Sequence, residues 1–314
     1  MSQPLNVLSF GAGAQSTAVL LMSCLGELPK LDCAIFADTG WEPKAVYRQF
    51  EWAKGVAERH GIPVQKVSNG NIRSDMMRAY LRKEDHSNKD GGRWANMPFF
   101  TKDKRTGKVG LTRRQCTNEY KITPIEKFIK TELLGLKPRG RWPIDVAVRH
   151  WFGISADETG RISQPAYTKT VKRPGLFGEV EEKVSVPIRW KANVYPLIGV
   201  ELRGTWERLR INEHWMDREA CVQWTADHGF PAAPKSACIG CPFHGEDMWQ
   251  AMKESEPEDW EDACQFDDAI RDRGGMRGQL FLHRSCTPLR DVDFTPLVQL
   301  GGVLQGCETG YCMT

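Results

Sequence analysis

The sequence predicts an α/β fold, in which a doubly wound parallel sheet is followed by a helical extension that carries cysteines. Two observations lead to this prediction. Over the first 70 residues, short apolar runs alternate with amphipathic stretches at the spacing of strand–helix–strand crossovers. From residue 201 onward the pattern is mostly helical, with a cysteine-bearing loop at 231–244. We therefore divide the chain into an α/β domain at 1–200 and a helical region at 201–314.

The first five elements follow from hydrophobic period and from glycine and proline. Strands are expected at 5–10, 32–37 and 64–67, because these runs are short, apolar and bounded by turn residues. Helices are expected at 15–25, which stops near Gly26, and at 43–60, where Pro43 suits the first turn and Gly61 ends the element.

Two long polar segments separate the later elements. Residues 84–112 are basic and contain glycine, so we expect a long loop there. A helix is expected at 123–134 and a strand within 144–154, followed by a second polar excursion at 155–193.

Composition excludes several classes of protein. The chain has 314 residues, of which 40% are hydrophobic and 26% charged, so it is not disordered, collagen-like or a coiled coil throughout. The longest apolar stretch, 17–25, is too short to cross a bilayer, and the start lacks the basic region of a signal peptide. We expect a soluble, cytoplasmic protein with no membrane partner, whose ten cysteines are reduced.

Charge is unevenly distributed along the chain. Residues 82–114 hold ten Lys or Arg against four Asp or Glu, a local charge of +6. Residues 242–272 hold eleven acids against two bases, a local charge of −9. The total of +3 conceals this asymmetry, which restricts any polyanion to one face of the molecule.

A loop of small residues follows the first expected strand. Its candidate nucleotide-binding residues are Ser9, Phe10, Gly11, Gly13, Gln15, Ser16 and Thr17. Small residues let backbone N–H groups approach an anion, and the N-terminus of the next helix adds positive partial charge. The loop is neither a Walker loop nor a GxGxxG motif. The alternative is a tight strand-to-helix turn packed on the sheet.

Acidic residues follow two other expected strands. Asp38 ends the second strand, where it would hold a ribose hydroxyl or magnesium, or else cap the next helix. Gly153, Asp157, Glu158 and Arg161 follow the strand within 144–154 and suit a nucleotide's magnesium and phosphates, although a solvated loop has the same composition.

These segments, in this order, resemble the PP-loop nucleotide-binding superfamily. The nearest part is the branch of phosphoadenosine-phosphosulfate reductases and of enzymes that thiolate nucleic acids, DNA phosphorothioation and tRNA thiolation among them. The Asp38-Thr39-Gly40 turn is typical of the reductase-like members. The family loop Ser-Gly-Gly-x-Asp-Ser appears here as residues 11–16, with Gln15 in place of the aspartate. The resemblance implies ATP and magnesium as cofactors, whereas Gln15 resembles the reductases, whose loop does not cleave ATP.

The cysteines suggest a metal site. Cys238 and Cys241 form a C-x-x-C followed by proline, a pattern common at metal and iron–sulfur sites, and further ligands must come from elsewhere in the fold. Cys116 lies where the resembling families place a cluster cysteine, and Cys221 opens the helix that leads into the C-x-x-C loop. The expected cofactor is a [4Fe–4S] cluster on these four residues, with zinc or plain thiols as alternatives.

Two further cysteines lie in the glycine-containing tail. Cys307 and Cys312 would deliver sulfur or electrons to the site, together with Asp38 as the catalytic set. Sulfonucleotide reductases also use a cysteine near the C-terminus, although their Glu-Cys-Gly context is missing here. The alternative is a frayed end with incidental thiols.

The basic segment interleaves aromatic residues with cations. Cations neutralise phosphates and aromatic rings stack on bases, so this composition suits a single-stranded nucleic acid, although a solvated loop explains the charge equally well. The candidate nucleic-acid contacts are Trp94, Phe99, Lys102, Lys104, Arg105, Arg113 and Arg114.

Three functions are compatible with these motifs. The first is an ATP-dependent sulfurtransferase that modifies a nucleic acid or nucleobase and takes sulfur from a donor. The second is a sulfonucleotide reductase of the phosphoadenosine-phosphosulfate type, which needs a thiol reductant. The third is a non-catalytic protein that senses nucleotides or binds nucleic acid.

Overall fold

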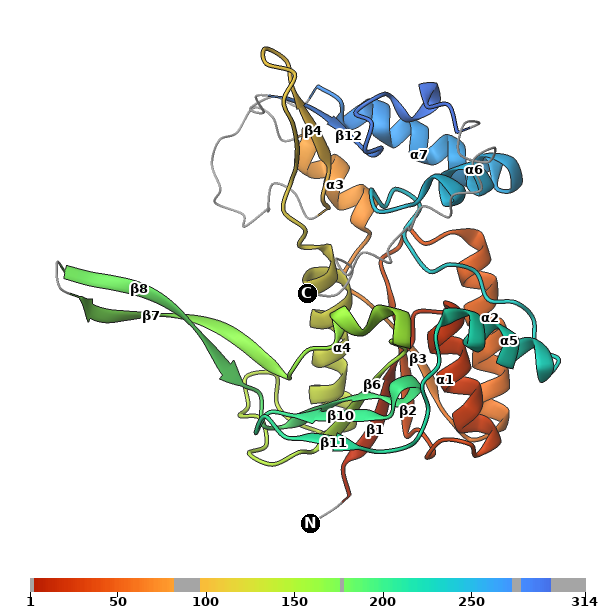
Figure 1. The fold of residues 1–314 in the computed structure, drawn as a ribbon, viewed down its shortest axis with the longest axis vertical. Helices are drawn as coiled ribbons and strands as arrows, with labels where there is room; N and C mark the ends of the chain where they lie inside the picture. The colour runs from red at the N-terminus through yellow and green to blue at the C-terminus, as the bar shows by residue number, and fades with distance from the viewer. Residues whose placement is uncertain (1–2, 82–96, 176–177, 273–277, 295–314) are drawn as a thin grey trace.

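A seven-stranded sheet forms the centre of the protein (Figure 1). The structure is a computed structural model that describes residues 3–81, 97–175, 178–272 and 278–294. In the order in which they pair, the strands are β11 (Arg208–Arg210), β10 (Val200–Arg203), β9 (Lys191–Tyr195), β6 (Val148–Phe152), β1 (Leu5–Ser9), β2 (Cys33–Asp38) and β3 (Val64–Ser68). The last five run parallel, and β10 and β11 are antiparallel additions at one edge.

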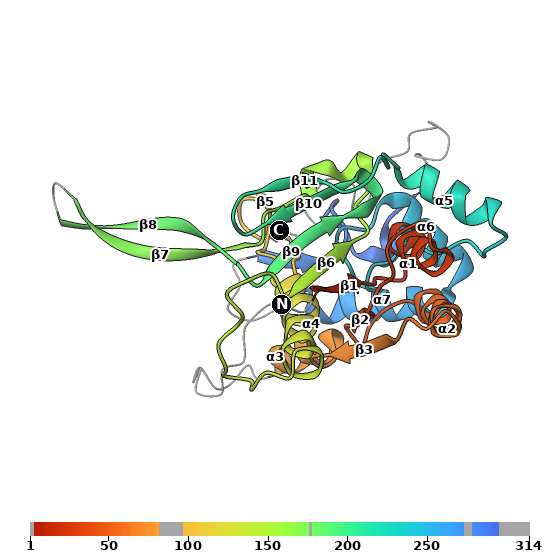
Figure 2. The same cartoon turned by 90° about the horizontal axis from the view of Figure 1, so that it is seen from below.

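Helices cover both faces of this sheet because alternate residues of each strand point to opposite sides. Leu8 and Phe10 face α1 (Ala14–Leu25) and α2 (Lys44–Arg59), and α5 (Arg218–Asp227) packs outside against α1. Val7 faces Ile125 and Ile129 on the opposite side. That side is covered by one helical run made of η2 (Thr117–Ile122), α4 (Thr123–Phe128) and η3 (Ile129–Leu133), and Figure 2 shows the sheet between the two layers.

A second hydrophobic cluster lies above the sheet in Figure 1, and we call this part of the molecule the upper lobe. Its elements are α3 (Ile72–Leu81), β4 (Phe100–Asp103), β5 (Val109–Leu111), α6 (Glu246–Ser255), α7 (Pro257–Ile270) and β12 (Gly278–Phe281). The strand β12 pairs with β4, so residues from both ends of the chain build this lobe together. Its centre includes the fully buried rings of Phe99, Trp249 and Phe266.

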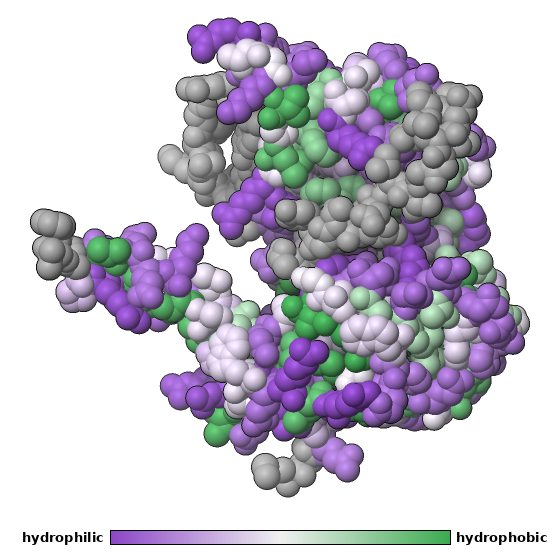
Figure 3. Space-filling model, in the orientation of Figure 1, coloured by the Kyte–Doolittle hydropathy of each residue, from purple (hydrophilic) through white to green (hydrophobic). Residues whose placement is uncertain are grey.

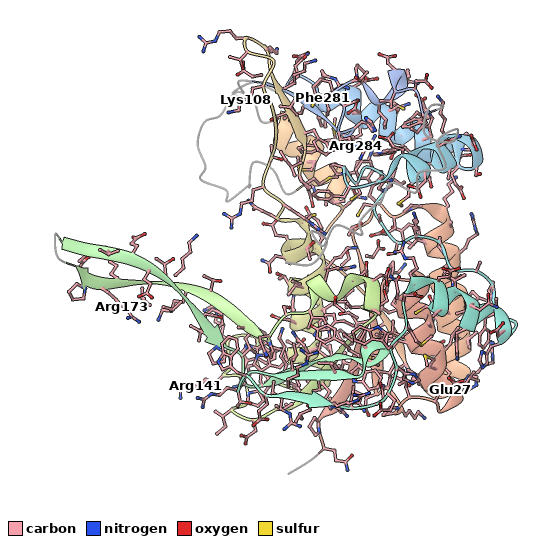
Figure 4. All side chains as sticks on the ribbon, in the orientation of Figure 1. Glu27, Lys108, Arg141, Arg173, Phe281 and Arg284 are labelled. Carbon is pink, nitrogen blue, oxygen red and sulfur yellow. The ribbon has the colours of Figure 1, made fainter. Side chains whose placement is uncertain are left out.

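A long two-stranded arm extends from the body. Strands β7 (Ala166–Gly175) and β8 (Gly178–Pro187) pair along their whole length and stand away from the sheet in both ribbon views. Arg173 lies near its tip in Figure 4, and the face visible in Figure 3 mixes hydrophilic with hydrophobic residues. Three short turns of 3-10 helix complete the described structure, at Ala156–Arg161, Pro196–Ile198 and Leu289–Asp291.

The predicted fold class is confirmed in its general form, a mixed α/β protein with a large, mostly parallel sheet. The first five elements lie within two residues of the expected ranges. Two features of the later part of the chain were not predicted. The polar segment 155–193 contains the arm and β9, and the region after 200 begins with β10 and β11 before its first helix. The expected division after residue 200 therefore falls inside β10, which belongs to the central sheet.

Among the described residues, we found no helix that combines the length and the apolar character needed to cross a membrane.

Candidate functional site

The sheet has one point at which its connections change direction. From β1 the chain proceeds to β2 and β3 on one side, whereas β6 and β9 lie on the other side of β1. Ligands of open α/β sheets bind outside the carboxyl ends of the strands at such a point. The glycine loop follows β1, and the segment that begins with Gly153 follows β6, so both predicted segments meet at this crevice.

The glycine loop presents an uncapped helix N-terminus. Gly13 precedes α1 with an extended backbone, has no side-chain cap, and is followed by a first turn without acidic residues. The Ser16 hydroxyl holds the loop closed, because its oxygen accepts from Gly11 N at 3.2 Å and donates to Gly13 O at 3.2 Å. Ala12 adopts a φ of 56°, which tightens the turn. The first turn of α1 therefore keeps the positive partial charge that favours an anion.

The segment after β6 packs directly on this loop. A Cβ added at Gly153 would lie 2.6 Å from Ser16 N and 2.9 Å from the carbonyl carbon of Gln15, so only glycine fits there. Gln15 Nε2 donates to Ser155 Oγ at 3.4 Å and to Glu158 Oε2 at 3.3 Å. Gln15 therefore braces the two segments against each other.

The acidic residues of this segment already have protein partners. Glu158 is only 4% exposed and is paired with Arg161 as well as Gln15. Asp157 Oδ1 accepts from the backbone N–H of Arg218, at the start of α5, at 3.1 Å. The predicted magnesium ligands Asp157 and Glu158 thus serve, in this structure, to hold the crevice together.

Asp38 closes the turn at the end of β2. Its Oδ1 accepts from Gly40 N at 2.7 Å and from the Tyr47 hydroxyl at 2.8 Å, and Lys66 Nζ lies 4.0 Å from Oδ2. Gly40 has a φ of 73°, the left-handed conformation that this turn requires. Burial raises the pKa of the Tyr47 hydroxyl, and its bond to the Asp38 carboxylate raises it further, so it remains a donor at neutral pH.

The cysteine-bearing loop lies across both turns. A Cβ added at Gly13 would be 3.1 Å from Ser236 Cβ, so residues 234–236 rest on the glycine loop. Ile239 N donates to Trp41 O at 2.9 Å, and Gly240 is packed so tightly on the Trp41 ring that a Cβ there would lie 2.1 Å from it. This contact between the C-x-x-C loop and the crevice was not predicted, because the sequence places the segments about 200 residues apart.

Cys238 lies partly buried at the centre of this contact. Its Sγ lies 3.2 Å from Thr39 Oγ1 and 3.5 Å from Glu42 Oε1. Burial raises the pKa of the Cys238 thiol well above its ordinary value, and the Glu42 carboxylate adds to this effect, whereas Lys121 opposes it. Cys116 is near enough to influence the same pKa. With these neighbours, Cys238 is a neutral thiol at pH 7.

The four predicted metal ligands are not brought together. Cys116 packs against the hydrophobic cluster of the upper lobe, and Cys241 lies one turn beyond Cys238. Cys221 instead belongs to the core between the sheet and α1, where burial, with Asp157 and Asp217 nearby, raises its pKa to about 12. In the described ranges, no group of three or more His, Cys, Asp or Glu residues is placed to hold a metal ion. The tail cysteines Cys307 and Cys312 lie outside these ranges.

One buried atom beside Cys238 nevertheless suits a further bound group. Glu42 is 4% exposed, and its Oε2 has no hydrogen-bond partner among the described residues. A buried carboxylate oxygen without a donor is unfavourable unless a ligand supplies one. The residues therefore fit a small bound group at Glu42 and Cys238, but they do not assemble a four-thiolate set for an iron–sulfur cluster or zinc. No chemical step below depends on a metal at these cysteines.

The described part of the basic segment, residues 97–114, contains a hairpin where a loop was expected. Strands β4 and β5 lie within it, and Lys102, Lys104, Arg105 and Arg113 are exposed. Lys102 and Lys104 line a cavity of about 400 Å³, where Lys104 pairs with Asp272 at 2.6 Å. The guanidinium of Arg114 lies 5.5 Å from the centre of the Phe243 ring.

The expectation that Phe99 stacks on a base is wrong. Phe99 is fully buried and packs near Phe266, with ring centres 6.3 Å apart. It belongs to the hydrophobic core of the upper lobe because alternate residues at the start of β4 face inward. Trp94, the other predicted stacking residue, lies outside the described residues.

Sequence reasoning also missed a partner of Ser9. The Ser9 hydroxyl lies 2.7 Å from His150 Nε2, and His150 is 5% exposed. Nothing in the sequence pattern around His150 indicates this contact. Since β1 and β6 pair in register, with Val7 opposite His150, both side chains are on the same face of the sheet. His150 thus fixes the position of the Ser9 side chain at the edge of the crevice.

The burial of His150 predicts an acid-sensitive fold. Burial lowers its pKa to about 3, with the Lys191 ammonium contributing, whereas an exposed histidine titrates near 6.5. The unfolded chain therefore binds more protons below pH 6.5, and the stabilising contribution is lost progressively as the pH falls toward 3. Between pH 7.5 and 5.0, this residue should account for about 2 kcal/mol of lost stability.

Urea unfolding of the wild type and of His150→Gln at several pH values measures this contribution. The quantity to compare is the change in the free energy of unfolding with pH in the wild type minus that in the variant, because other groups titrate in both proteins. We expect the variant to lose less stability than the wild type on acidification; parallel pH profiles would mean that folding does not lower the pKa of His150.

Comparison with known proteins adds no relative: no protein-family model matches the chain, and a search of curated proteins found no significant match.

Proposed function

We propose that the chain binds an adenine nucleotide at the crevice and uses it, as an ATP-dependent sulfurtransferase of the PP-loop type, to thiolate a nucleic acid or nucleobase. The observation that supports this most strongly is the contact between the cysteine loop and the glycine loop. It puts the Cys238 thiol beside the Asp38–Glu42 turn, at the edge of the crevice where an anion is favoured.

The crevice residues have separate roles in this proposal. Backbone N–H groups at the start of α1 bind the phosphates, and Ser16 keeps the loop in the shape that exposes them. Asp38 holds a ribose hydroxyl through Oδ2, because Oδ1 is occupied by Gly40 and Tyr47. Magnesium accompanies the phosphates of ATP, and since Asp157 and Glu158 are engaged elsewhere, they act by bracing the crevice.

The chemistry requires activation before substitution. A base carbonyl oxygen is a poor leaving group until it attacks the α-phosphate of ATP, which forms an O–P bond and releases pyrophosphate. A sulfur nucleophile from a donor then forms a C–S bond, and the C–O bond breaks with AMP leaving. Cys238 suits a positioning role in the second step, because its thiol lies beside the Asp38–Glu42 turn and can hold the incoming sulfur nucleophile by a hydrogen bond, while that nucleophile itself forms the C–S bond.

A specific feature favours the reductase as second candidate. Gln15 replaces the loop aspartate of the family and bonds to Ser155 and Glu158, so it does not face the phosphates. A loop of this kind binds a nucleotide without cleaving it. In that case the substrate is an adenylated sulfate, and an external thiol reduces it to sulfite.

Product analysis distinguishes the candidates. The protein is purified anaerobically, its iron, zinc and sulfide are measured, and it is incubated with Mg-ATP, sulfide and an RNA or DNA oligonucleotide. We expect pyrophosphate release that depends on the oligonucleotide, together with sulfur in the product. Sulfite formed from phosphoadenosine phosphosulfate, without pyrophosphate, would establish the reductase instead. Nucleotide binding with neither product would favour a sensing protein.

A matched pair of variants tests the thiol. Cys238→Ser should keep pyrophosphate release and lower sulfur incorporation at least about tenfold, because Cys238 positions the nucleophile only in the step after activation. Cys24→Ser is the control, since Cys24 is a partly buried thiol near the opposite end of α1. Equal sulfur incorporation by the two variants would remove Cys238 from the reaction.

A further inference from the structure

A serine, a histidine and a glutamate meet in a cavity of the upper lobe, apart from the residues assigned to the crevice. Ser285 Oγ lies 2.7 Å from His283 Nδ1, and His283 Nε2 lies 3.0 Å from Glu246 Oε2. All three residues line a cavity of about 280 Å³. Figure 4 labels Arg284, which lies between the serine and the histidine in the sequence, in this upper part of the molecule.

The hydrogen bonds define the protonation of the imidazole. The backbone N–H of Ser285 donates to His283 Nδ1 at 3.2 Å, so this nitrogen carries the lone pair. The ring proton is then on Nε2 and is donated to Glu246 Oε2. Arg284 holds the other carboxylate oxygen, with its Nε at 3.0 Å and its Nη2 at 2.8 Å. The bond from Nε2 to Glu246 therefore orients the ring so that Nδ1 faces the serine hydroxyl.

Exposure differs between the serine and the groups behind it. Ser285 is exposed at the cavity, whereas His283 is 4% exposed. Burial lowers the pKa of His283, although the Glu246 carboxylate opposes this shift. The imidazole is thus neutral at pH 7, which is the form that accepts a proton from a hydroxyl group.

We propose that Ser285 is an activated nucleophile for acyl transfer, with His283 as its general base and Glu246 as the residue that positions the base. A nucleophile within hydrogen-bond reach of a base, itself oriented by a third group, is the arrangement that makes a hydroxyl reactive. This site is independent of the nucleotide crevice and of the cysteines.

The reaction is the hydrolysis of a carboxylic ester. Ser285 Oγ attacks the carbonyl carbon while its proton passes to His283 Nδ1; the bond to the alcohol oxygen breaks, and the departing oxygen takes that proton. Water then attacks the Ser285 ester, gives one proton to Nδ1, and the acid leaves as the proton returns to Ser285. Ester and water become acid and alcohol, with the protein unchanged.

The lining of the cavity selects the kind of ester. Val292 offers limited apolar contact, whereas Asp291 and Asp293 add negative charge beside Glu246. An anionic acyl group is therefore repelled, and a small acyl group that is neutral or positively charged is favoured. The volume, close to the lower limit for ligand cavities, excludes long acyl chains.

A fluorophosphonate probe tests the proposal on the intact protein. Such probes form a stable bond with an activated serine, and peptide mass spectrometry locates the adduct without any variant. We expect one adduct, on Ser285, and faster hydrolysis of the p-nitrophenyl ester of glycine than of the corresponding succinate monoester, after correction for the uncatalysed rates. Folded protein that acquires no adduct at Ser285 would overturn the proposal.

Variants then separate reactivity from structure. Ser285→Ala should abolish the adduct, whereas Thr287→Ala, a hydroxyl removed from the same cavity, should leave the labelling rate within twofold. His283→Ala should slow labelling at least about 100-fold.

Glu246→Ala and Arg284→Ala both break the same ion pair, but only the first removes the acceptor of the His283 proton. We expect at least a tenfold loss for Glu246→Ala and less than a twofold loss for Arg284→Ala; equal losses would make Glu246 merely structural.

Discussion

Gly153→Ala is expected to destabilise the protein and to weaken nucleotide binding. The new Cβ would lie within 2.9 Å of three backbone atoms, the nitrogen and Cα of Ser16 and the carbonyl carbon of Gln15. Backbone atoms cannot rotate away as a flexible side chain would, so the end of β6 and the start of α1 must separate. Overpacking of this kind costs about 3 kcal/mol, and the displaced N–H groups should weaken nucleotide binding by at least about tenfold.

Gly160→Ala is the matched control for this variant. Gly160 lies in the same segment, and a Cβ there meets nothing within 4 Å. Urea unfolding and calorimetric titration with Mg-ATP should therefore give wild-type values for Gly160→Ala and reduced values for Gly153→Ala. If Gly153→Ala binds the nucleotide as the wild type does, the glycine loop is not the binding element.

The second large effect is expected for Asp267→Ala in the upper lobe. Asp267 is fully buried and accepts from Leu282 N at 2.7 Å and Leu289 N at 2.9 Å, besides pairing with Arg271. It therefore fastens the segment after β12 to α7. Removal leaves a largely buried guanidinium and two backbone donors without their acceptor, which should cost about 4 kcal/mol in the free energy of unfolding.

The neighbouring acid provides the control. The Asp268 side chain is 55% exposed and lies 4.0 Å from Arg271 and 3.9 Å from Arg290, so it makes only weak, solvent-screened pairs. Asp268→Ala should change the free energy of unfolding by at most about 0.5 kcal/mol. Similar unfolding midpoints for Asp267→Ala and Asp268→Ala would refute the role given to Asp267.

The first five elements could be predicted because each has one consistent environment. Strand β2 is apolar up to Asp38, as buried parallel strands are, β1 contains the apolar Leu5, Val7 and Leu8, and α2 has a clear apolar face. The sequence of the arm shows no comparable apolar pattern. Both faces of β7 and β8 are largely exposed, so their side chains show no regular alternation of apolar and polar residues. The charged segment that contains them was therefore interpreted only as a polar excursion.

The sequence predicted the local segments of the site, but not the contacts between segments that are far apart in the chain. Residues near the ends of β1, β2 and β6 were identified because parallel strands bring their carboxyl ends to one edge. The long-range contacts were not, since nothing local in the sequence indicates that Cys238 meets Thr39 or that Cys221 packs on α1. The burial of Phe99 was missed for the same reason, since it depends on the upper lobe, in which β12 pairs with the distant strand β4.

Hydrogen exchange with and without Mg-ATP tests the central claim most directly, since it locates the nucleotide on the intact chain. If the nucleotide binds at the carboxyl ends of β1 and β6, peptides that cover 10–17 and 234–241 should be protected together, because the cysteine loop rests on the glycine loop. The cavity near Lys102 serves as the internal comparison and should be unaffected. Protection confined to that cavity, or an exchange pattern unchanged by saturating Mg-ATP, would contradict the account.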